Sequence, residues 1–280
     1  MLIKIINPQN INKTINVSEY MAFIERIAIS SSGNTYYIKN IHLDLHTKDG
    51  FLSKEDISAA IGGATIKSNT GVDFFIFEPS LADLYKKISR GPQIIPRKDL
   101  GFIVAETGMN KGSIVLDAGT GSGAAACFFG MIAKEVFTYE LREDFLQIAQ
   151  KNIEQMGLAN VTLKLGDVYQ SIDETGMDIA VLDLPEPWKA VENVNKALKA
   201  GGFLVAYSPT TPQVQDFVTE TNKHQNLLVL KVVEIGEREW EVRERKVRPK
   251  SQSIGHSGFI VIARKVGEIH TPKENHQLSP

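Results

Sequence analysis

Four acidic residues, Asp117, Glu140, Asp167 and Asp183, each stand at or just after the end of a short apolar run. These runs have the length and composition of buried strands, and the segments between them have helical periodicity. Strands that alternate with helices form a parallel sheet, and reacting groups collect where the carboxyl ends of its strands meet. Carboxylates at that edge could bind hydroxyl or amino groups, or take up a proton.

A glycine-rich turn, Gly119-Thr120-Gly121-Ser122-Gly123, follows the first strand and precedes a small, apolar helix expected over 124–133. Glycine lets the backbone turn tightly and approach a ligand, and the free N–H groups at the start of the helix face the same crevice. The turn lacks the Gly-Lys-Ser/Thr of a P-loop and is not a clean G-x-G-x-x-G. By itself it indicates a nucleotide-like ligand only weakly, and a purely structural turn is the alternative.

The spacing of the next two acids narrows the choice of ligand. Glu140 ends the second strand about 20 residues after the turn, where a carboxylate can bind a ribose diol. Asp167 ends the third strand and could reach an adenine amino group, although aspartate there is also a common helix N-cap. This pattern is typical of S-adenosylmethionine-dependent methyltransferases, with an NAD-dependent oxidoreductase as the alternative. The predicted cofactor-binding residues are Asp117, Gly119, Thr120, Gly121, Ser122, Gly123, Glu140, Asp167, Val168 and Asp183.

The fourth acid, Asp183, is followed by a proline-stiffened loop that contains Pro185 and Trp188. Amino-methyltransferases present an acid in this way, because the acid accepts a hydrogen bond from the amine while the loop holds the ring. We therefore predict that Asp183 is the catalytic residue and that Pro185 and Trp188 contact the substrate. The alternative for Trp188 is that it and Pro187 only begin the following helix.

Composition excludes several classes of protein. The 280 residues carry 31 Lys and Arg against 33 Asp and Glu, and 42% of them are hydrophobic, so a sizeable core is expected and wholesale disorder is not. The single cysteine, Cys127, excludes an intrachain disulfide and a cysteine-clustered zinc site, and we expect no metal. The chain has neither a signal-peptide pattern nor a run of apolar residues long enough to span a bilayer, which predicts a soluble, cytoplasmic protein with no membrane partner.

The order of the expected elements predicts an α/β fold with a Rossmann-like domain over residues 100–265. Its mostly parallel, seven-stranded sheet is expected to contain strands at 114–117, 136–139, 161–165, 178–183, 203–207, 229–235 and 258–263, the last two as an antiparallel pair. Residues 1–75 contain short strands, including 36–38, 41–45 and 74–77, that predict a small β-barrel-like domain. We expect a linker helix and loop over 76–99 and a loose tail over 266–280.

The chain resembles the tRNA (adenine-N1)-methyltransferases of the TrmI type over nearly its whole length. Early motifs that match are Leu45 to Gly50, Pro79 to Asp83, Gln93 to Ile95, and Lys98-Asp99. Late motifs that match are Leu204 to Tyr207, Gln213, Arg238 to Val242, Arg248-Pro249, and Gly255 to Phe259. In one departure, Pro96-Arg97 replaces the aromatic or histidine residue and proline that relatives have before Lys98, so a ring expected against the target base is missing or supplied from elsewhere.

The resemblance implies transfer of a methyl group from S-adenosylmethionine to N1 of an adenine in the tRNA T-loop, at position 58, with position 57 as a further candidate. The adenine must leave its stack to be reached, and Asp183 would accept a hydrogen bond and a proton from its exocyclic amine. The expected substrate-binding residues are Gln93, Arg97, Pro185, Trp188, Arg248 and His256. Family members form homotetramers, so the expected partners are tRNA and three further copies of the chain.

Two basic clusters could contact tRNA phosphates: Lys86, Lys87, Arg90, Arg97 and Lys98, and the six Lys or Arg residues between 238 and 250. Ordinary solvated surface is the alternative for each. The remaining alternatives for the function are a methyltransferase that acts on another RNA base or on protein, an NAD-dependent oxidoreductase, and a non-catalytic RNA-binding subunit.

Overall fold

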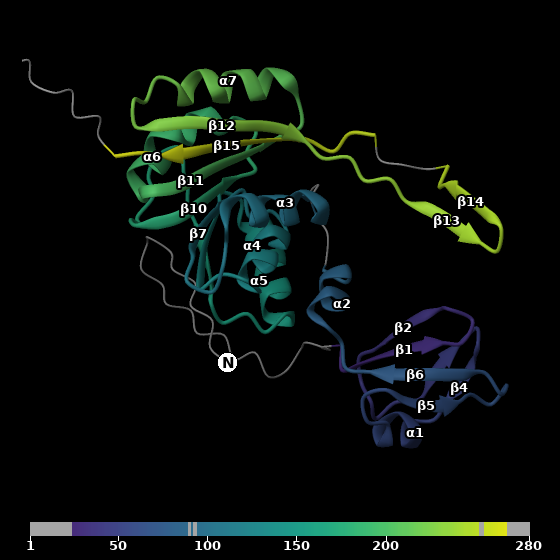
Figure 1. Cartoon of the computed structure of the whole chain (residues 1–280). Coiled ribbons are helices and arrows are strands. Elements are labelled where there is room, and N and C mark those ends of the chain that lie inside the picture. The colour runs from purple at the N-terminus through teal and green to yellow at the C-terminus, as the bar shows by residue number, and fades with distance from the viewer. Residues whose placement is uncertain (1–23, 89–90, 92–93, 252–254, 268–280) are drawn as a thin grey trace, which may run out of the picture.

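The computed structural model describes residues 24–88, 91, 94–251 and 255–267. Its centre is a seven-stranded sheet of order β12-β15-β11-β10-β7-β8-β9 (Figure 1). The strands in chain order are β7 (Ile114–Ala118), β8 (Glu135–Glu140), β9 (Val161–Leu165), β10 (Met177–Leu182), β11 (Leu198–Ser208), β12 (Leu227–Glu234) and β15 (Phe259–Lys265). Strands β7 to β11 are parallel, and β15 is antiparallel to both β11 and β12. This confirms the predicted fold class, including the antiparallel terminal pair.

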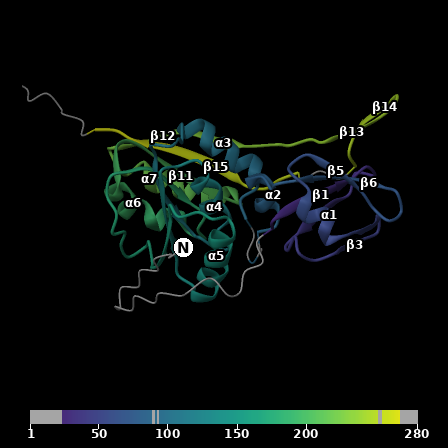
Figure 2. The ribbon, with the colours of Figure 1, turned by 90° about the horizontal axis from the view of Figure 1, so that it is seen from below.

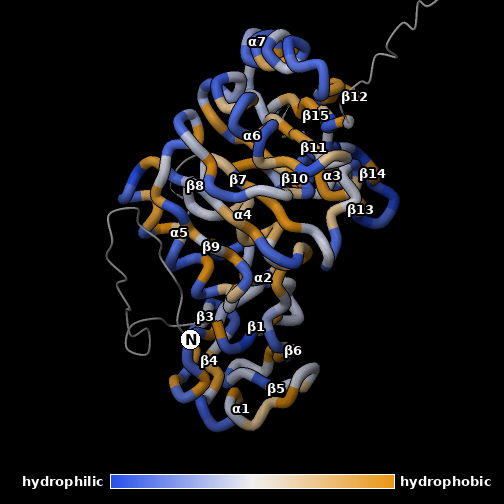
Figure 3. The backbone as a smooth tube through the Cα atoms, turned by 90° about the vertical axis from the view of Figure 1, so that its left-hand side faces the viewer, coloured by the Kyte–Doolittle hydropathy of each residue, from blue (hydrophilic) through white to orange (hydrophobic). Residues whose placement is uncertain are grey.

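Helices cover both faces of this sheet, because alternate residues of its strands point to opposite sides. Val115 and Val181 pack into one core with α3 (Arg97–Thr107), α4 (Ala124–Gly130) and α5 (Glu143–Gln155). Their neighbours Leu116 and Leu182 pack into a second core with α6 (Val191–Ala197) and α7 (Thr211–Thr221). The sheet appears as a hydrophobic layer between helices of mixed polarity (Figure 3).

The strand order reverses at β7, since the chain runs outward through β8 and β9 and then returns to β10 on the other side. In open α/β sheets a ligand crevice lies at such a reversal, outside the carboxyl ends of the strands. This places the turn after β7 beside the loop after β10.

Residues before α3 form a smaller antiparallel sheet of order β2-β1-β6-β5 (Figure 1). It contains β1 (Arg26–Ser30), β2 (Thr35–Ile38), β5 (Ala64–Lys67) and β6 (Asp73–Phe77), accompanied by a hairpin of β3 (Leu45–Thr47) and β4 (Gly50–Leu52), and by helices α1 (Lys54–Ala59) and α2 (Leu81–Lys86). Residues 41–43 form turns, so the strand predicted over 41–45 is wrong there. Side-chain oxygens explain this difference, because Asn40 accepts from the amide of His42 and Asp44 accepts from the amide of Lys54.

A two-stranded hairpin of β13 (Trp240–Arg243) and β14 (Lys246–Pro249) interrupts the chain between β12 and β15. It extends away from the central sheet (Figures 1 and 2). The boundaries predicted for the two domains, the linker and the tail remain predictions, and most of the tail lies outside the described residues.

Candidate functional site

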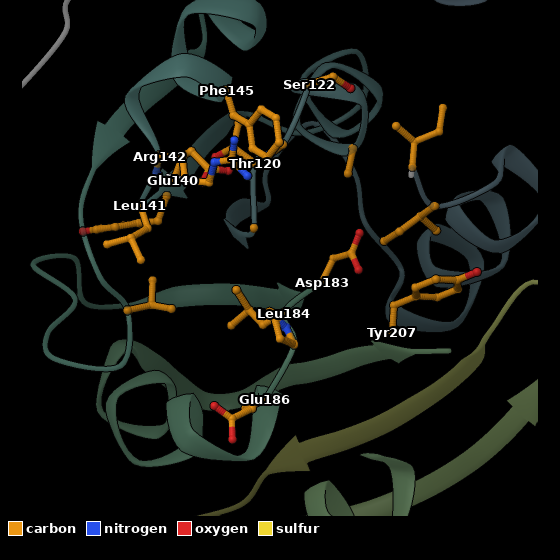
Figure 4. Close-up of a pocket in the computed structure, with 18 of the residues that line it drawn as sticks. Thr120, Ser122, Glu140, Leu141, Arg142, Phe145, Asp183, Leu184, Glu186 and Tyr207 are labelled. Carbon is orange, nitrogen blue, oxygen red and sulfur yellow. Dashed lines mark hydrogen bonds between the residues drawn. The ribbon is translucent and has the colours of Figure 1, made fainter. Parts of the chain in front are cut away.

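A cavity of about 560 Å³ opens at the carboxyl ends of β7, β8, β10 and β11 (Figure 4). Its size is within the range of about 300–1,000 Å³ that is usual for sites of small molecules and cofactors. The sequence-predicted residues on its wall are Gly119, Thr120, Gly121, Ser122, Glu140, Asp167, Val168, Asp183 and Pro185. The structure therefore brings most of the predicted cofactor-binding residues together around one cavity.

The glycine turn is joined directly to the loop that carries Asp183. The amide of Asp183 donates to the carbonyl of Ala118 at 2.9 Å. Gly119 has a φ of +91°, and a Cβ added there would lie 2.1 Å from the carbonyl oxygen of Asp183. Glycine at 119 is therefore required by the close approach of two strand ends, and not only by a ligand.

At the other end of the turn, Gly123 has a φ of +77° and marks the start of α4. A Cβ on Gly123 would lie 3.0 Å from the Cβ of Ala149 in α5. Gly123 is therefore required by the close packing of α4 against α5. It is not on the cavity wall.

Asp117 lies beneath the turn and is not on the cavity wall, although it was predicted as a cofactor contact. Its side chain is fully buried, and its Oδ2 accepts from the hydroxyl of Thr138 at 2.6 Å. Thr138 is also 2.6 Å from the hydroxyl of Thr120, so Thr120 must donate in this chain of hydrogen bonds. Burial raises the pKa of Asp117 to about 6.

Glu140 holds the turn through its carboxylate. Its Oε2 accepts from the amide of Gly121 at 2.8 Å, and its Oε1 accepts from the amide of Arg142 at 3.0 Å. Each oxygen keeps a further lone pair for a ligand hydroxyl. The side chain is buried and lines the cavity, so the carboxylate is fixed in place before any ligand binds.

Asp167 uses its carboxylate locally. Its Oδ1 accepts from the amide of Tyr169 at 2.9 Å, and its Oδ2 accepts from the side-chain amide of Gln170 at 3.2 Å. No helix follows Asp167 in the described chain, because residues 168–170 form a turn and the next element is β10. Asp167 is therefore not the helix N-cap that the sequence left open but the first residue of an Asx turn. Because Asp167 and the buried Val168 also line the cavity, a role in ligand binding stays a prediction.

Asp183 differs from the other three acids because its carboxylate faces the cavity without a donor (Figure 4). Within the described part of the chain, no amide or side chain donates a hydrogen bond to it. Burial, with a smaller contribution from the charge of Asp117, raises the pKa of Asp183 to about 7. A half-buried carboxylate with this pKa is suited to exchange a proton with a bound molecule.

The predicted substrate-binding residues are more widely spread. Pro185 lines the cavity, whereas Trp188 lies in a short 3-10 helix, η2 (Pro187–Ala190), off its wall. Arg97 is exposed at the start of α3 and is not on the wall either. Gln93 lies outside the described residues. The alternative for Trp188, a place at the start of the next helix, therefore matches its position.

Two further predicted contacts lie outside the cavity wall. Arg248 is on β14 and forms an ion pair with Glu241 at 3.0 Å. His256 places Nδ1 2.5 Å from Glu234 and Nε2 2.9 Å from the carbonyl of Pro209, and its bond to Glu234 raises its pKa. Because Pro209 lines the cavity, His256 supports the wall from behind.

Sequence reasoning gave no site role to several wall residues, including Phe145, Tyr169, Tyr207 and Gln213. Tyr207 lies near the carboxyl end of β11, the strand next to β10. Because ligands bind outside the carboxyl ends of the strands in such sheets, this position could have predicted that Tyr207 lines the site. Gln213 donates to the carbonyl of Pro185 at 2.9 Å and so holds the loop after Asp183 from α7. That contact depends on tertiary packing and has no local signature.

Among the residues whose placement is described, no three His, Cys, Asp or Glu side chains form a cluster that could hold a metal ion. The helices in the same residues are all too short or too polar to cross a membrane.

The strand order, the antiparallel last strand, and the glycine turn beside strand-end acids define a class I methyltransferase fold. The sequence profile of a family described as the tRNA methyltransferase complex GCD14 subunit matches residues 79–258. A protein of Methanocaldococcus jannaschii named tRNA (adenine(57)-N(1)/adenine(58)-N(1))-methyltransferase TrmI is 35% identical over 272 residues, which cover 86% of this chain and 95% of that protein. The chain belongs to this family of tRNA methyltransferases.

Two solved structures are similar over most of the chain. A SAM-dependent O-methyltransferase from Thermotoga maritima superposes with a TM-score of 0.78 at 27% identity, covering 89% of this chain and 95% of that one. The tRNA (m1A58) methyltransferase TrmI from Aquifex aeolicus gives a TM-score of 0.74 at 27% identity, covering 89% of this chain and 99% of that one. Both covered regions extend beyond the central sheet into the small sheet.

Proposed function

We propose that this protein transfers a methyl group from S-adenosylmethionine to N1 of an adenine in the T-loop of tRNA. The observation that carries this proposal is the unpaired carboxylate of Asp183, which faces the cavity beside the glycine turn. The similar proteins of M. jannaschii and A. aeolicus are named for methylation at adenine 57 and 58 and at adenine 58 respectively. Position 58 is therefore the proposed target, with position 57 as a second candidate.

The cavity fits an adenosyl cofactor in three respects. Glu140 presents free lone pairs on two fixed carboxylate oxygens, as a ribose diol requires. Leu141 and Val168 give an apolar wall beside Asp167 for an adenine ring. The buried hydroxyl of Ser122 lines the cavity and has no hydrogen-bond partner among the described residues. When bound, S-adenosylmethionine would supply the methyl group as an electrophilic sulfonium.

On the substrate side, Asp183 would orient the adenine. Its carboxylate can accept a hydrogen bond from the exocyclic amine, which becomes more acidic when the ring gains charge at N1. The same oxygen would then take the proton, since a pKa of about 7 lets Asp183 hold or release it at neutral pH. Gln213 and the stiff loop at Pro185 would keep this side of the cavity in place.

The test is methylation of unmodified tRNA with labelled S-adenosylmethionine, followed by identification of the methylated nucleoside. We expect 1-methyladenosine from the wild type and a loss of about 10²- to 10⁴-fold in kcat for Asp183→Asn, the usual contribution of a general base. The matched control is Asp216→Asn, which makes the same change on the exposed surface of α7. Methyl transfer to guanine, cytosine or protein, or an Asp183→Asn variant that keeps full activity, would contradict the proposal.

We further propose that the protein works in the cytoplasm as a homotetramer bound to tRNA. The hairpin of β13 and β14 supports assembly, because Trp240, Val242 and Val247 expose an apolar face there. Of its basic residues, Arg243 and Arg248 share Glu241 on the same hairpin, which leaves Arg245 and Lys246 as the more available phosphate ligands among the described residues. In the other basic cluster Lys98 is buried against Asp99, and Arg90 lies outside the described residues.

A further inference from the structure

The small sheet has one face that packs into the small core and an opposite face on which Ile27 is buried but two phenylalanines are exposed. Residues Ala28, Phe74 and Ile76 belong to the small hydrophobic core. Because successive side chains of a strand alternate, Phe75 and Phe77 on β6 point to the opposite side. This second surface, which we call the outer face, is built from Ile27, Ile29, Thr35, Tyr37, Thr65, Phe75 and Phe77.

The outer face carries three aromatic rings in register. Ile27 on β1 pairs with Tyr37 on β2 and with Phe77 on β6, so the two rings flank it in one row. Phe75 lies two residues from Phe77, about 7 Å along the strand, in the next row. Phe75 and Phe77 are 38% and 39% exposed, far more than large apolar side chains in the core.

Positive charge borders these rings. The ammonium of Lys87, just after α2, lies 3.9 Å from the centre of the Tyr37 ring. Lys39 is exposed where β2 ends, and neither lysine forms an ion pair within the described ranges. Asp73 is at the end of the outer face, but Lys67 neutralises it at 2.7 Å.

The face is rigid before any partner binds. The hydroxyl of Tyr36, which points away from the outer face, donates to Asp49 at 2.6 Å. Ser30 and Asn34 donate to the same carboxylate at 2.8 Å each and hold the β1–β2 turn. A preformed surface loses less conformational entropy when it binds.

We propose that the outer face binds unpaired nucleotides of the tRNA by stacking their bases on Phe75 and Phe77, beside the Tyr37 ring that Lys87 covers. An antiparallel sheet with exposed aromatic residues on one face is a known solution for binding single-stranded RNA. Each base has a flat apolar face that suits a ring, and each phosphate suits a lysine without a carboxylate partner. This inference rests on the proposed function, since it assigns a second contact to the same tRNA.

The test compares full-length variants in binding of unmodified tRNA. Phe75→Ala and Phe77→Ala are each expected to weaken tRNA affinity by about fivefold or more, the lower end for one lost base stack. They should leave kcat at saturating tRNA and the KM for S-adenosylmethionine unchanged. Phe75→Tyr should bind as the wild type does. The matched control, Ile61→Ala, removes an 83% exposed apolar side chain from the same domain but not from the outer face.

Salt dependence separates stacking from charge. Lys87→Met should reduce the slope of log Kd against log salt by about 1, the value for one lost phosphate contact. The phenylalanine variants should shift affinity at every salt concentration without changing this slope. Ultraviolet cross-linking of the wild-type complex should join T-arm or neighbouring unpaired nucleotides to peptides that contain Tyr37 or Phe75.

The possible failures are distinguishable. If the wild type methylates tRNA and both phenylalanine variants bind it with unchanged affinity, the outer face has no such role and the proposed function stands. If the variants change the sedimentation mass but not the affinity for tRNA, the face contacts another copy of the chain and the inference is overturned. A wild type that neither binds nor methylates tRNA would overturn the proposed function itself.

Discussion

At the scale of single residues, the site depends on two carboxylates that share one buried environment. Asp117 lies fully buried under the turn with one hydrogen bond to Thr138, and Asp183 faces the cavity without a donor among the described residues. Burial raises the pKa of both carboxyls, and the charge of Asp117 raises the pKa of Asp183 further. Asp117, which is not on the cavity wall, therefore raises the pKa of Asp183, which is on the wall.

This coupling predicts a particular dependence of the reaction on pH. The ionised form of Asp183 is the one that accepts a hydrogen bond and a proton, so kcat/KM should rise with pH and level off above the pKa of about 7. In Asp117→Asn the neighbouring charge is gone, so the pKa of Asp183 falls and the midpoint should move below 7 toward the ordinary aspartate range. Rates measured from about pH 5 to 9 would show this shift.

The exposed variant Asp216→Asn serves as the control for this experiment, because it removes the same charge from a position on α7 that is not on the cavity wall. Its midpoint should equal that of the wild type. A midpoint that stays at the wild-type value in Asp117→Asn would show that Asp117 does not set the acidity of Asp183.

At the scale of elements, the ends of β7 and β10 meet at a single glycine. Gly119→Ala should be much more harmful than alanine at another glycine of positive φ, because its Cβ would lie 2.1 Å from the Asp183 carbonyl. Gly201 has a φ of +82° with nothing near its Cβ position, so Gly201→Ala carries only the backbone cost of about 1–2 kcal/mol. We expect Gly119→Ala to lose about 1–3 kcal/mol more in urea unfolding, from overpacking. Equal losses of stability in the two variants would mean that the ends of β7 and β10 move apart at no cost to accommodate the new Cβ.

A buried ion pair joins the start of α3 to the segment before β15. The ammonium of Lys98 lies 2.8 Å from Asp99 and donates to the carbonyl of Ile235 and the hydroxyl of Ser257, each at 2.6 Å. Ser257 donates to the fully buried Asp99 at 2.9 Å. This network explains why Lys98-Asp99 and the motif from Gly255 to Phe259 occur together in the sequence.

Removing one partner from this network should be costly. Lys98→Met leaves the buried charge of Asp99 uncompensated, and we expect a loss of about 3–5 kcal/mol in the free energy of unfolding. The double variant Lys98→Met/Asp99→Leu should recover much of that loss, because it removes both charges. Urea titrations of the wild type and both variants would measure this. A double variant that is less stable than Lys98→Met would show that the charged pair itself stabilises the fold.

Local sequence patterns were enough to predict the strands of the central sheet, because each contains a short apolar run, and five of the seven end at or just before an acid or a glycine. The same patterns placed Glu140 and Asp183 at the cavity. They misplaced Asp117, since a fully buried acid and a wall acid at the end of a strand have the same local sequence. The turn at 41–43 was missed because Asn40 and Asp44 bind the backbone there and override strand propensity.

Other parts of the site follow from tertiary contacts that have no local signature. Tyr207 and Gln213 reach the cavity from β11 and α7 only after the sheet is assembled. His256 supports Pro209 through the packing of the terminal strands. For these residues the family motifs carried information that periodicity did not.

At the scale of the whole molecule, charge sets a constraint on how tRNA is bound. The chain has a formal net charge of −2, and three of the six Lys or Arg residues between 238 and 250 are paired with Glu239 or Glu241. A single chain therefore offers few free cations to a polyanion. Two kinds of contact would strengthen tRNA binding: contacts from several copies of the chain, and contacts such as base stacking that do not depend on charge.

The projecting hairpin of β13 and β14 is the element that should hold such copies together. A two-stranded hairpin is at best marginally stable alone in water, yet this one exposes Trp240, Val242 and Val247 by 54%, 67% and 60%. In the proposed homotetramer another copy would cover these side chains. Val242→Glu places a charge on that apolar face, so the wild-type mass of four times the 31.0 kDa chain should fall in light scattering, and tRNA affinity should fall with it. Lys246→Glu puts the same side chain on the opposite, charged face of the hairpin and should leave the mass unchanged. A Val242→Glu variant that keeps the wild-type mass would exclude the hairpin as the assembly element.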